Sequence, residues 1–552
     1  MTPEQLAEHI RRALNALEAD GVVQIGEPFD VIIERPKNKD HGDYATNIAM
    51  KLSKVVQKNP REFAELLATK LNQNPHIAGA EVAGPGFLNI RVAADAQGAV
   101  AIEIVKAGSQ YGHTTEMVGR SVNLEFISAN PTGPLHLGHT RWAAVGDAMA
   151  RVIGSTGAKV TREFYINDRG NQMDKFGQSL MARAHGEEPP EDGYLGEYVG
   201  ELAGEIVAED PTIVDLPKDE QSVEFRERGY QGQLAQQRDQ LHEFNTDFDV
   251  WFSERSLHES GAVDRALVLL REQGNLFESE GATWMATSKF GDDKDRVLVR
   301  SNGELTYFAS DTAYYVDKRD RGFDECLYLL GADHHGYVGR LEAMAACVGD
   351  TPGEHVQVLI GQLVKIFKDG EELRLSKRAG TMVTLRELID LIGVDALRYT
   401  LIRYPVDSPL TLDVADMTKK SSDNPVYYVQ YAHARLASIL RNAQDLGIEM
   451  DIDSFEPALL SHEREGDLLR ALADFPRVVA RAAQLREPHR VARYLEDTAS
   501  DFHKFYDSCR VLPQGDEELN DTHRARLVLV AATKVVVANG LELLGVSAPE
   551  RM

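Results

Sequence analysis

The sequence predicts an α/β protein in which a parallel sheet lies between a small α+β unit and an all-α helix bundle. Three observations predict this fold. Residues 121–166 read as strand, loop, helix and strand, which is the order of a βαβ unit. Two further apolar stretches, Glu325–Leu330 and His355–Ile360, are each followed by glycine and have the character of buried strands. From about residue 424 onward, apolar residues recur at the three- and four-residue spacing of helices.

Length and charge limit the organisation of the chain. The 552 residues leave room for about three or four domains of roughly 100 to 200 residues each. There are 60 Lys and Arg against 87 Asp and Glu, and the net charge of -27 argues against wholesale attraction to nucleic acid or anionic membranes. A polyanion must therefore bind a local basic patch. Thirteen acids against one lysine lie in residues 187–224, which we expect to be an insertion that faces the solvent.

The cysteines and the start of the sequence indicate a cytoplasmic protein. Cys326, Cys347 and Cys509 are far apart and form no C-x-x-C pair, so neither a zinc ribbon nor a disulfide framework is indicated and no metal ligands are expected. The first residues carry acids where a signal peptide would be basic, and no apolar run approaches the roughly 18 residues of a membrane helix. We expect a reducing compartment and no membrane contact.

Residues 1–110 are predicted to form the α+β unit. A helix opens it, with apolar residues at Leu6, Ile10, Leu14 and Leu17. A short strand is expected at Val31–Glu34, followed by a second helix that carries Ile48, Leu52 and Val55. Residues 84–86, Gly-Pro-Gly, then form a turn that feeds a strand ending at Val92.

Residues 111–423 are predicted to form the sheet domain. The first strand is Val122–Ile127, the loop Asn130–Pro134, the helix Leu135–Ile153 and the second strand Lys159–Ile166. Neither a dinucleotide-binding G-x-G-x-x-G nor a P-loop motif occurs at this turn, so neither class is supported.

After the last sheet strand, the sequence pattern changes from strands to helices. Asp369-Gly370 predicts a hairpin turn, and the capping box Thr384–Glu387 predicts the start of a helix. Residues 424–552 are predicted to be helical throughout, and the apolar spacing is clearest in Leu468–Ala483, Val491–Phe502 and Ala525–Val537.

Two histidines stand at the start of the helix that follows the first sheet strand. His136 and His139, with the small Gly138 between them, lie where unpaired N–H groups and the helix dipole favour phosphate. Imidazoles can donate to phosphate oxygens as charge develops, and glycine allows close approach to the backbone. The strand, loop and helix around the motif make a chance match a poor explanation.

A basic loop lies some 240 residues downstream. Arg374-Leu-Ser-Lys-Arg378 precedes the capped helix, and a loop that holds Lys377 between two arginines can close on a triphosphate. Alone, such a loop is more often a solvated surface. Together with the histidine motif, it indicates a site that stabilises a departing pyrophosphate.

These motifs resemble those of the class I aminoacyl-tRNA synthetases. Residues 136–139 match the HIGH motif, and residues 374–378 match the KMSKS loop except at Arg374, Leu375 and Arg378. Within this class the chain is most similar to the arginyl-tRNA synthetases, and the matching segments span nearly its whole length: Phe126–His139, Tyr165–Asn171, Phe248–Arg255, Asn424–Arg435 and Leu544–Met552. The resemblance implies a Rossmann-type catalytic domain, an N-terminal domain that contacts tRNA, and an anticodon-binding helix bundle.

The resemblance also implies which residues form the active site. His136, His139 and Lys377 are the expected catalytic residues. ATP, with Mg²⁺ on its phosphates, is expected at Pro131, Thr132, Gly133, Pro134, His136, Gly138, His139, Asp333, His334, Ser376 and Lys377. Arginine is expected at Glu125, Ser128, Asn130, His139, Tyr307, Asp311 and His335. His335 stands where some relatives have glutamine, so its contact with the amino group stays open beside a nucleotide-side role.

Arginine as a substrate makes a specific chemical demand. A planar guanidinium needs carboxylate acceptors in a fork, which a lysine ammonium cannot use equally well. The segment Glu304–Tyr315 reads as a helix, and its i,i+4 spacing places Tyr307 and Asp311 on one face. A surface pair of an aromatic and an acid is the alternative reading.

Transfer RNA is the expected macromolecular partner. Residues 470–493 hold six arginines against two acids, a local basic patch in an acidic protein. A solvated helix face explains this patch equally well. The resemblance places tRNA contacts at Phe87, Asn89, Tyr428, Tyr431, His433, Arg435, Arg477, Arg481 and Arg490, while core packing stays open for Phe87 and for the first helix of the bundle.

We therefore expect an arginine–tRNA ligase that acts as a monomer and activates arginine only when tRNA is bound. A nucleotidylyltransferase or a cysteinyl synthetase is disfavoured by the long helical region, and the latter also by the absence of zinc-ligand cysteines. A catalytically silent RNA-binding paralogue would be expected to lose His136, His139, Lys377 or Asp311. All four are present.

Overall fold

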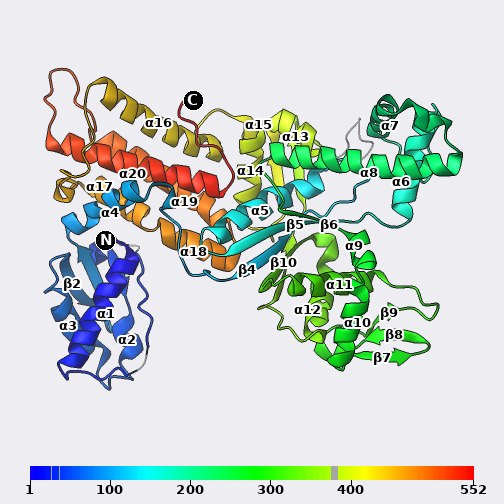
Figure 1. Cartoon of the computed structure of the whole chain (residues 1–552). Coiled ribbons are helices and arrows are strands. Elements are labelled where there is room, and N and C mark those ends of the chain that lie inside the picture. Colours follow the sequence, from blue (N-terminus) through cyan, green and yellow to red (C-terminus); the bar gives the residue numbers. More distant parts are fainter. Residues whose placement is uncertain (27, 37, 374–382) are drawn as a thin grey trace.

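The computed structural model describes residues 1–26, 28–36, 38–373 and 383–552 (Figure 1). A five-stranded parallel sheet lies at its centre in the order β11-β10-β4-β5-β6. The strands are β4 (Ser121–Glu125), β5 (Lys159–Ile166), β6 (Val250–Ser253), β10 (Glu325–Gly331) and β11 (Val356–Gly361). The predicted α/β class is confirmed, and four of these five strands match predicted ones within two residues.

Helices cover both faces of this sheet. On one face, α5 (Leu137–Gly154) packs against α14 (Val394–Ile402) and against the helix bundle in one continuous apolar core. On the other face, α10 (Ala262–Glu272), α11 (Tyr307–Asp320) and α12 (Val338–Cys347) enclose a second core. Because the strands are parallel, the carboxyl ends of β4, β5, β6 and β10 meet at one edge of the sheet, where ligands bind in such folds.

The N-terminal unit has a core of its own. It contains α1 (Pro3–Ala19), α2 (Ile48–Leu52), α3 (Pro60–Leu71) and an antiparallel sheet of β1 (Tyr44–Thr46), β2 (Ile77–Ala83) and β3 (Phe87–Val92). The predicted strand at Val31–Glu34 is wrong. Only Glu34 pairs, through a two-bond bridge with Ala45, so an apolar run too short to form a ladder remains an irregular segment.

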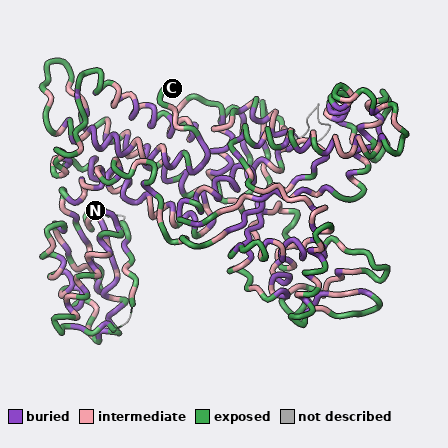
Figure 2. Tube along the Cα trace, viewed as in Figure 1, coloured by how far each residue is buried: buried purple, intermediate pink, exposed green. Residues whose placement is uncertain are grey.

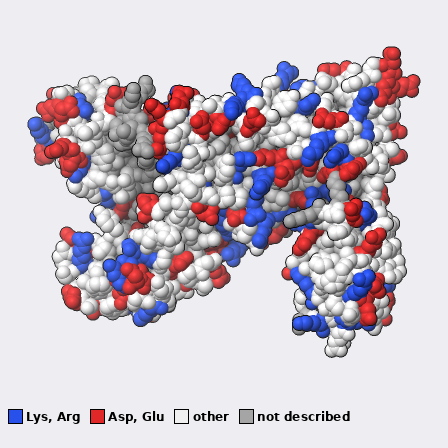
Figure 3. Space-filling view, turned by 180° about the vertical axis from the view of Figure 1, so that it is seen from behind, with Lys and Arg blue, Asp and Glu red and all other residues white. Residues whose placement is uncertain are grey.

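The acidic segment 187–224 belongs to a helical arm that projects from the sheet domain. The arm consists of α6 (Asn171–Ala184), α7 (Glu197–Glu209) and α8 (Lys218–Glu243). Its inner faces share an apolar cluster that includes Phe176, Val199 and Phe225, all 0% exposed. The acids of this segment do face the solvent, as expected, but the segment is more than a solvated surface. Acidic side chains lie on the arm's surface, but its apolar residues build a core (Figure 3).

Two small sheets and several short helices complete the central body. One sheet contains β7 (Leu276–Ser279), β8 (Ala282–Met285) and β9 (Arg296–Val299), and the other contains β12 (Val364–Lys368), β13 (Glu371–Glu372) and β14 (Leu410–Asp413). The predicted turn between β12 and β13 is confirmed, because Asp369 and Gly370 both have positive φ angles. The short helices are α9 (Glu254–Glu259), α13 (Leu385–Ile392) and α15 (Val414–Thr418).

The bundle contains α16 (Pro425–Asp445), α17 (Glu463–Ala473), α18 (Phe475–Leu485), α19 (His489–Ser508) and α20 (Asp521–Leu543). The earlier helix α4 (Ala94–Ala107) packs on α17 and α20, so the bundle also receives a chain segment from the opposite end of the sequence. Figure 2 shows buried residues in both the sheet and the bundle, and they belong to one apolar core. Among the helices in the described part of the chain, none combines the length and apolar character needed to cross a membrane.

Arg398 of α14 joins three parts of the molecule. Its fully buried guanidinium donates to Asp147 Oδ2 of α5 at 2.6 Å. The same group donates to the carbonyl oxygen of Phe244, after α8, at 2.7 Å, and to that of Leu544, after α20, at 3.0 Å. The sheet domain, the arm and the end of the bundle therefore share one buried charge.

Candidate active site

His136 and His139 cap the helix α5 at the carboxyl edge of the sheet. His136 is the N-cap residue, and its Nδ1 accepts the Gly138 N–H at 3.1 Å. The His136 N–H in turn donates to His139 Nδ1 at 3.3 Å. This reciprocal arrangement is a capping box in which both partners are histidines. The ring centroids lie 3.9 Å apart, so the sequence motif forms one compact group.

Both imidazoles are poised as neutral hydrogen-bond donors. Burial lowers the pKa of His136, and burial together with His136 lowers the pKa of His139 to about 3. Each Nδ1 accepts a backbone N–H, so the proton of each neutral ring lies on Nε2. The two Nε2–H groups can therefore donate to an anionic ligand at the start of α5.

Lys377 and Ser376, like the rest of the predicted basic loop, lie outside the described residues. The chain after that loop is described, and it pairs with the histidine segment. Leu137 N–H donates to the Val383 carbonyl and Leu385 N–H to the Leu135 carbonyl, both at 2.9 Å. Thr384 then caps α13 through the predicted capping box with Glu387. Residues 383–385 therefore lie directly beside His136.

Glu125 lies at the carboxyl end of β4 with both carboxylate oxygens engaged. Lys318 Nζ donates to its Oε2 at 2.6 Å, and Ser128 Oγ donates to its Oε1 at 3.0 Å. The lysine is 0% exposed, and Tyr314 and Tyr328 face its ammonium group at 4.3 and 4.0 Å. Sequence reasoning missed Lys318, although it lies seven residues after Asp311 and so on the same face of α11.

The backbone beyond β4 is strained where it turns into the site. Ile127 and Ser128 have φ angles of 70° and 46°, which non-glycine residues rarely adopt. The turn brings the Ser128 hydroxyl between Glu125 and the Tyr165 N–H, which donates to it at 3.3 Å. Strain of this kind is characteristic of functional sites.

Asp311 is the second predicted acid, and it faces the same space. Tyr337, a residue that sequence reasoning missed, donates its hydroxyl proton to Asp311 Oδ2. Burial raises the pKa of Asp311 to about 6 against this hydrogen bond, which lowers it, and Glu125 and Glu254 raise it as well. A bound cation would therefore stabilise the ionised carboxylate of Asp311.

Tyr307 is the first residue of α11, one turn before Asp311. Its side chain is 81% exposed and so available to a ligand, and within the described part of the chain it makes no hydrogen bond. The predicted helix start at Glu304 is wrong, because Leu305 bridges to Val299 and the Thr306 hydroxyl caps the helix by accepting the Ala309 N–H. The i,i+4 relation of Tyr307 and Asp311 within the helix is confirmed.

Glu254 is a third acid that sequence reasoning left out of the site. It follows β6, is buried, and has its pKa raised chiefly by burial. Tyr165 lies between the three acids, since burial and then Glu254, Asp311 and Glu125 raise the pKa of its phenol. Tyr165 and Glu254 lie in the segments Tyr165–Asn171 and Phe248–Arg255. The resemblance to the family singled out these segments but assigned neither residue a role.

The remaining predicted ligand residues surround the same edge. Asp333, His334 and His335 form an exposed turn directly after β10, in which His334 Nε2 lies 3.3 Å from Asp333 Oδ2. In the loop before α5, Pro131 and Thr132 are buried and Asn130 is exposed. The structure thus brings the histidine pair, the acids Glu125, Asp311 and Glu254, and this turn to the same edge of the sheet.

Comparisons with known proteins show which family has this arrangement. Three family models match the chain in succession: arginyl tRNA synthetase N terminal domain over 4–92, tRNA synthetases class I (R), catalytic domain over 102–191 and 208–399, and DALR anticodon binding domain over 429–552. An arginine–tRNA ligase from Kineococcus radiotolerans is 53% identical over 100% of both chains. The chain belongs to the arginyl-tRNA synthetase family.

Solved arginyl-tRNA synthetases share the fold. A putative arginyl-tRNA synthetase from Campylobacter jejuni is 31% identical, with a TM-score of 0.75 over 84% of this chain and 100% of that one. The Thermus thermophilus arginyl-tRNA synthetase is 24% identical, with a TM-score of 0.76 over 100% of both chains, and this likeness concerns the fold. The predicted family, class I assignment and three-part architecture are confirmed.

Helix α16, which enters the region matched by the anticodon-binding model at residue 429, carries an aromatic surface. Tyr427 and Tyr431 stack at 6.2 Å, and Tyr431 is 40% exposed. Tyr428 lies 5.1 Å from the ring of His503. The guanidinium of Arg435 lies 4.4 Å from the Tyr506 ring. In an arginyl-tRNA synthetase these flat, partly exposed rings are suited to unstacked RNA bases.

His433 differs from its predicted tRNA-binding role. It is 2% exposed, and its Nδ1 is hydrogen-bonded to the Pro549 carbonyl at 2.9 Å. A ring that is buried against the segment after α20 cannot stack on RNA in this structure. His433 therefore serves to hold that segment on α16.

Only part of the predicted arginine patch faces the solvent. Arg486 is buried against Glu325 at 2.8 Å, and Arg470 pairs with Asp43 at 2.7 Å. Arg477 donates to the Ile33 carbonyl at 2.7 Å, but its side chain is still 39% exposed. Arg481 and Arg490 are exposed, although Arg490 also pairs with Glu487. On the N-terminal unit, Phe87 is 38% exposed and Asn89 lies in β3.

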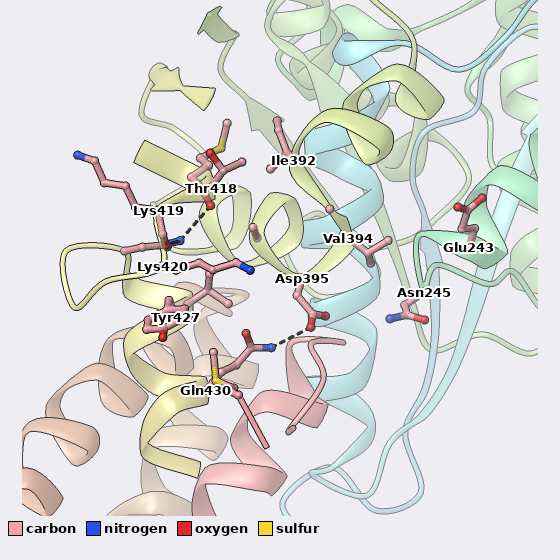
Figure 4. A pocket seen from close by; sticks show the side chains of 16 residues that line it. Glu243, Asn245, Ile392, Val394, Asp395, Thr418, Lys419, Lys420, Tyr427 and Gln430 are labelled. Carbon is pink, nitrogen blue, oxygen red and sulfur yellow. Dashed lines mark hydrogen bonds between the residues drawn. The ribbon is translucent and has the colours of Figure 1, made fainter. Parts of the chain in front are cut away.

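A hollow of about 800 Å³ marks the place where the bundle meets the catalytic domain (Figure 4). Gln430 of α16 donates to Asp395 Oδ2 of α14 at 2.8 Å across its floor. The exposed Lys419 and Lys420 stand at its rim, beside Tyr427. In this family member the hollow is thus bordered by groups of the first bundle helix and of the catalytic domain.

Proposed function

We propose that the chain is an arginine–tRNA ligase. It activates L-arginine with ATP and transfers the arginyl group to the 3′-terminal ribose of arginine tRNA. The observation that carries this proposal is the position of the neutral pair His136 and His139 at the edge of a sheet that also carries the acids Glu125, Asp311 and Glu254. Membership of the family supports it.

The acids Glu125, Asp311 and Glu254 mark the proposed arginine site. Asp311 and Tyr307 receive the guanidinium, because one offers a fork of acceptor oxygens and the other an exposed ring and hydroxyl. Glu125 contributes less net charge than expected, since Lys318 already neutralises it. Ser128, Asn130, His139 and His335 are proposed for the amino-acid end. The buried carboxylates favour the guanidinium over a smaller ammonium through fork geometry.

ATP is proposed to lie along residues 131–134 and the start of α5. The Nε2–H groups of His136 and His139 donate to phosphate oxygens, and Gly138 keeps the helix start open. Asp333 and His334 are proposed on the nucleotide side, and Ser376 and Lys377 on the phosphates. Mg²⁺ fits here, because the neighbouring histidines are neutral and do not repel it. When bound, Mg²⁺ neutralises phosphate charge.

The proposed chemistry has two steps. A carboxylate oxygen of arginine attacks the α-phosphorus of ATP, the bond to the bridging oxygen breaks, and pyrophosphate leaves. A ribose hydroxyl, the 2′-OH in class I enzymes, then attacks the arginyl carbonyl and AMP leaves. His136 and His139 stabilise the charge that develops on phosphate oxygens. Neither step needs a covalent enzyme intermediate.

The tRNA is proposed to span the molecule. Phe87 and Asn89 contact it on the N-terminal unit, and Tyr428, Tyr431, Arg435, Arg477, Arg481 and Arg490 contact it on the bundle.

The proposed domains are 1–110, 111–423 and 424–552. We also propose a cytoplasmic monomer, consistent with three free, buried cysteines. In the described part of the chain no three His, Cys, Asp or Glu side chains cluster to hold a metal.

Arginine-dependent exchange between ATP and pyrophosphate tests the proposal, measured with and without arginine tRNA and with lysine and cysteine as controls. Exchange with arginine and tRNA together is the expected result. Exchange with arginine alone would keep the substrate but overturn the dependence on tRNA. Binding of tRNA without any exchange would favour a catalytically silent RNA-binding protein instead.

A further inference from the structure

The loop Asn130–Pro134 between β4 and α5 is held by the helical arm and not by its own domain. Its two prolines have no N–H, so the loop cannot form a regular ladder. Among the described residues, its backbone groups make no hydrogen bond to other backbone groups. Three of its carbonyl oxygens accept side-chain donors from the arm instead.

Two arm residues supply these donors. The Tyr198 hydroxyl, in the first turn of α7, donates to the Thr132 carbonyl at 2.8 Å. Gln237 Nε2, on α8, donates to the Gly133 carbonyl at 2.8 Å and to the Asn130 carbonyl at 3.1 Å. Gln237 is 0% exposed, so these bonds are shielded from water. They are the bonds that fix the loop in its place.

The arm is anchored firmly enough to act as a support. Arg255, directly after β6, forms a two-bond ion pair with Glu227 of α8 at 2.7 and 3.2 Å. Its Nε also donates to the Asp168 carbonyl, after β5, at 2.7 Å. The apolar cluster between α6, α7 and α8 fixes the helices to one another. Movement of the arm would therefore be passed on to the loop.

The geometry of the peptide unit gives these bonds a consequence for ligands. No peptide bond in the described chain is cis, and in a planar trans peptide the C=O and the following N–H point in opposite directions. Because the Thr132 carbonyl points at the arm, the Gly133 N–H points away from it. A Cβ on Gly133 would lie 3.3 Å from the Tyr198 hydroxyl oxygen, so glycine also permits this close contact.

We propose that Tyr198 and Gln237 are positioning residues for ATP, and that the arm built from α6, α7 and α8 holds the nucleotide loop in its binding conformation. The inference rests on the proposed function, in which residues 131–134 contact ATP. Tyr198 lies in residues 192–207, which the catalytic family model leaves unmatched, whereas Gln237 lies within the matched residues.

A pair of tyrosine variants tests the proposal. Tyr198→Phe removes only the hydroxyl that holds Thr132. Tyr194→Phe is the matched control, because Tyr194 packs on the same cluster and its hydroxyl has no hydrogen bond within the described residues. In the exchange assay with tRNA, Tyr198→Phe should raise the KM for ATP by about 2- to 10-fold, the range that one lost hydrogen bond gives. The KM for arginine and the Tm should stay at parent values.

A pair of glutamine variants provides an independent test. Gln237→Met removes both donor bonds, whereas Gln233→Met changes an equally buried glutamine whose Oε1 and Nε2 have no hydrogen-bond partner among the described residues. Only Gln237→Met should raise the KM for ATP. Rescue of the ATP KM by the conservative variant Gln237→Asn is not expected, because its shorter side chain cannot reach both carbonyls.

The outcomes separate the two proposals. If parent protein shows no arginine-dependent exchange, the proposed function fails. If parent protein is active and Tyr198→Phe and Gln237→Met match their controls in ATP KM, the positioning role is overturned. A loss of Tm with equal changes in both KM values would also overturn it, since the arm would then be a purely structural element.

Discussion

Lys318 neutralises Glu125, one of three acidic residues near Tyr165. It therefore lowers the net negative charge that these acids offer to a ligand. Its ammonium is fully buried between two aromatic rings and bonded to Glu125. The desolvation cost of such a buried pair can offset its attraction, but loss of one member leaves an unpaired buried charge. The net charge of the proposed arginine site therefore depends on a residue that need not touch the ligand.

Lys318→Met should destabilise the protein by about 3 to 5 kcal/mol, because Glu125 then becomes a buried and unpaired carboxylate. The double variant Lys318→Met/Glu125→Gln should recover most of this loss. Urea unfolding of both variants measures the difference. Equal stability of the single and double variants would show that the two residues are not coupled.

The pKa of Asp311 predicts a pH dependence of stability. Its pKa is about 6 in the folded protein against 3.8 ordinarily, so the folded state binds more protons between these values. Stability from this group is therefore fully present below about pH 4 and lost as pH rises through 6. Asp311→Asn removes the loss and should exceed the parent by about 3 kcal/mol at pH 7.5.

Urea unfolding at a series of pH values checks this, with Asp320→Asn, an exposed position on the same helix, as the control. The advantage of Asp311→Asn should shrink as pH falls from 6 to 4. A constant advantage at all pH values would argue that the carboxylate is not the cause.

Single residues of the site were predictable where a local motif carried them. His136, Gly138 and His139 lie within one helical turn, so their geometry follows from the strand, loop and helix alone. Lys318 and Tyr337 act on partners 193 and 26 residues away, and nothing local indicates such pairing. Long-range contacts of this kind emerge only from the packed fold.

Among the elements, α5 carries the histidines and must pack closely on β4. Gly146 faces Phe126, and a Cβ there would lie only 2.5 Å from the ring. Gly146→Ala should therefore destabilise the protein by about 1 to 3 kcal/mol, despite the better helix propensity of alanine. Gly154→Ala, at the open end of the same helix, should be neutral or slightly stabilising. Thermal unfolding compares them, and equal effects would contradict the packing argument.

Element prediction worked where burial was simple. The strands β5 and β10 and the capped start of α13 follow directly from apolar runs and from a capping box. The segment Leu468–Ala483, predicted as helical, is split into α17 and α18, because Pro476 lacks the N–H needed to continue a helix. The strand β6 was missed, since its residues are only half-buried at the sheet edge.

At the scale of the whole molecule, the largest core spans two domains, while the N-terminal unit has a core of its own. The larger core runs from Val100 to Val546 and crosses the predicted boundary at 423 without interruption. The N-terminal core contains residues from Met1 to Ala96. The two units meet through contacts such as the Arg470–Asp43 ion pair.

A fragment of residues 1–96 should therefore fold by itself, whereas a fragment of residues 1–423 should not fold beyond that unit, because the apolar face of α5 and α14 stays uncovered. Circular dichroism melts of both fragments and of the full chain measure this. A cooperative transition of the 1–423 fragment at the full-chain Tm would disprove the shared core.

The buried Arg398 also has a consequence for biosynthesis. Asp147 and the carbonyl of Phe244 are already available when α14 is made, but the carbonyl of Leu544 is not synthesised until nearly the whole bundle has followed. A nascent chain on the ribosome therefore holds an incompletely paired guanidinium in its catalytic domain. Chains that stop within the bundle should then be substrates for proteolytic quality control and not partial enzymes.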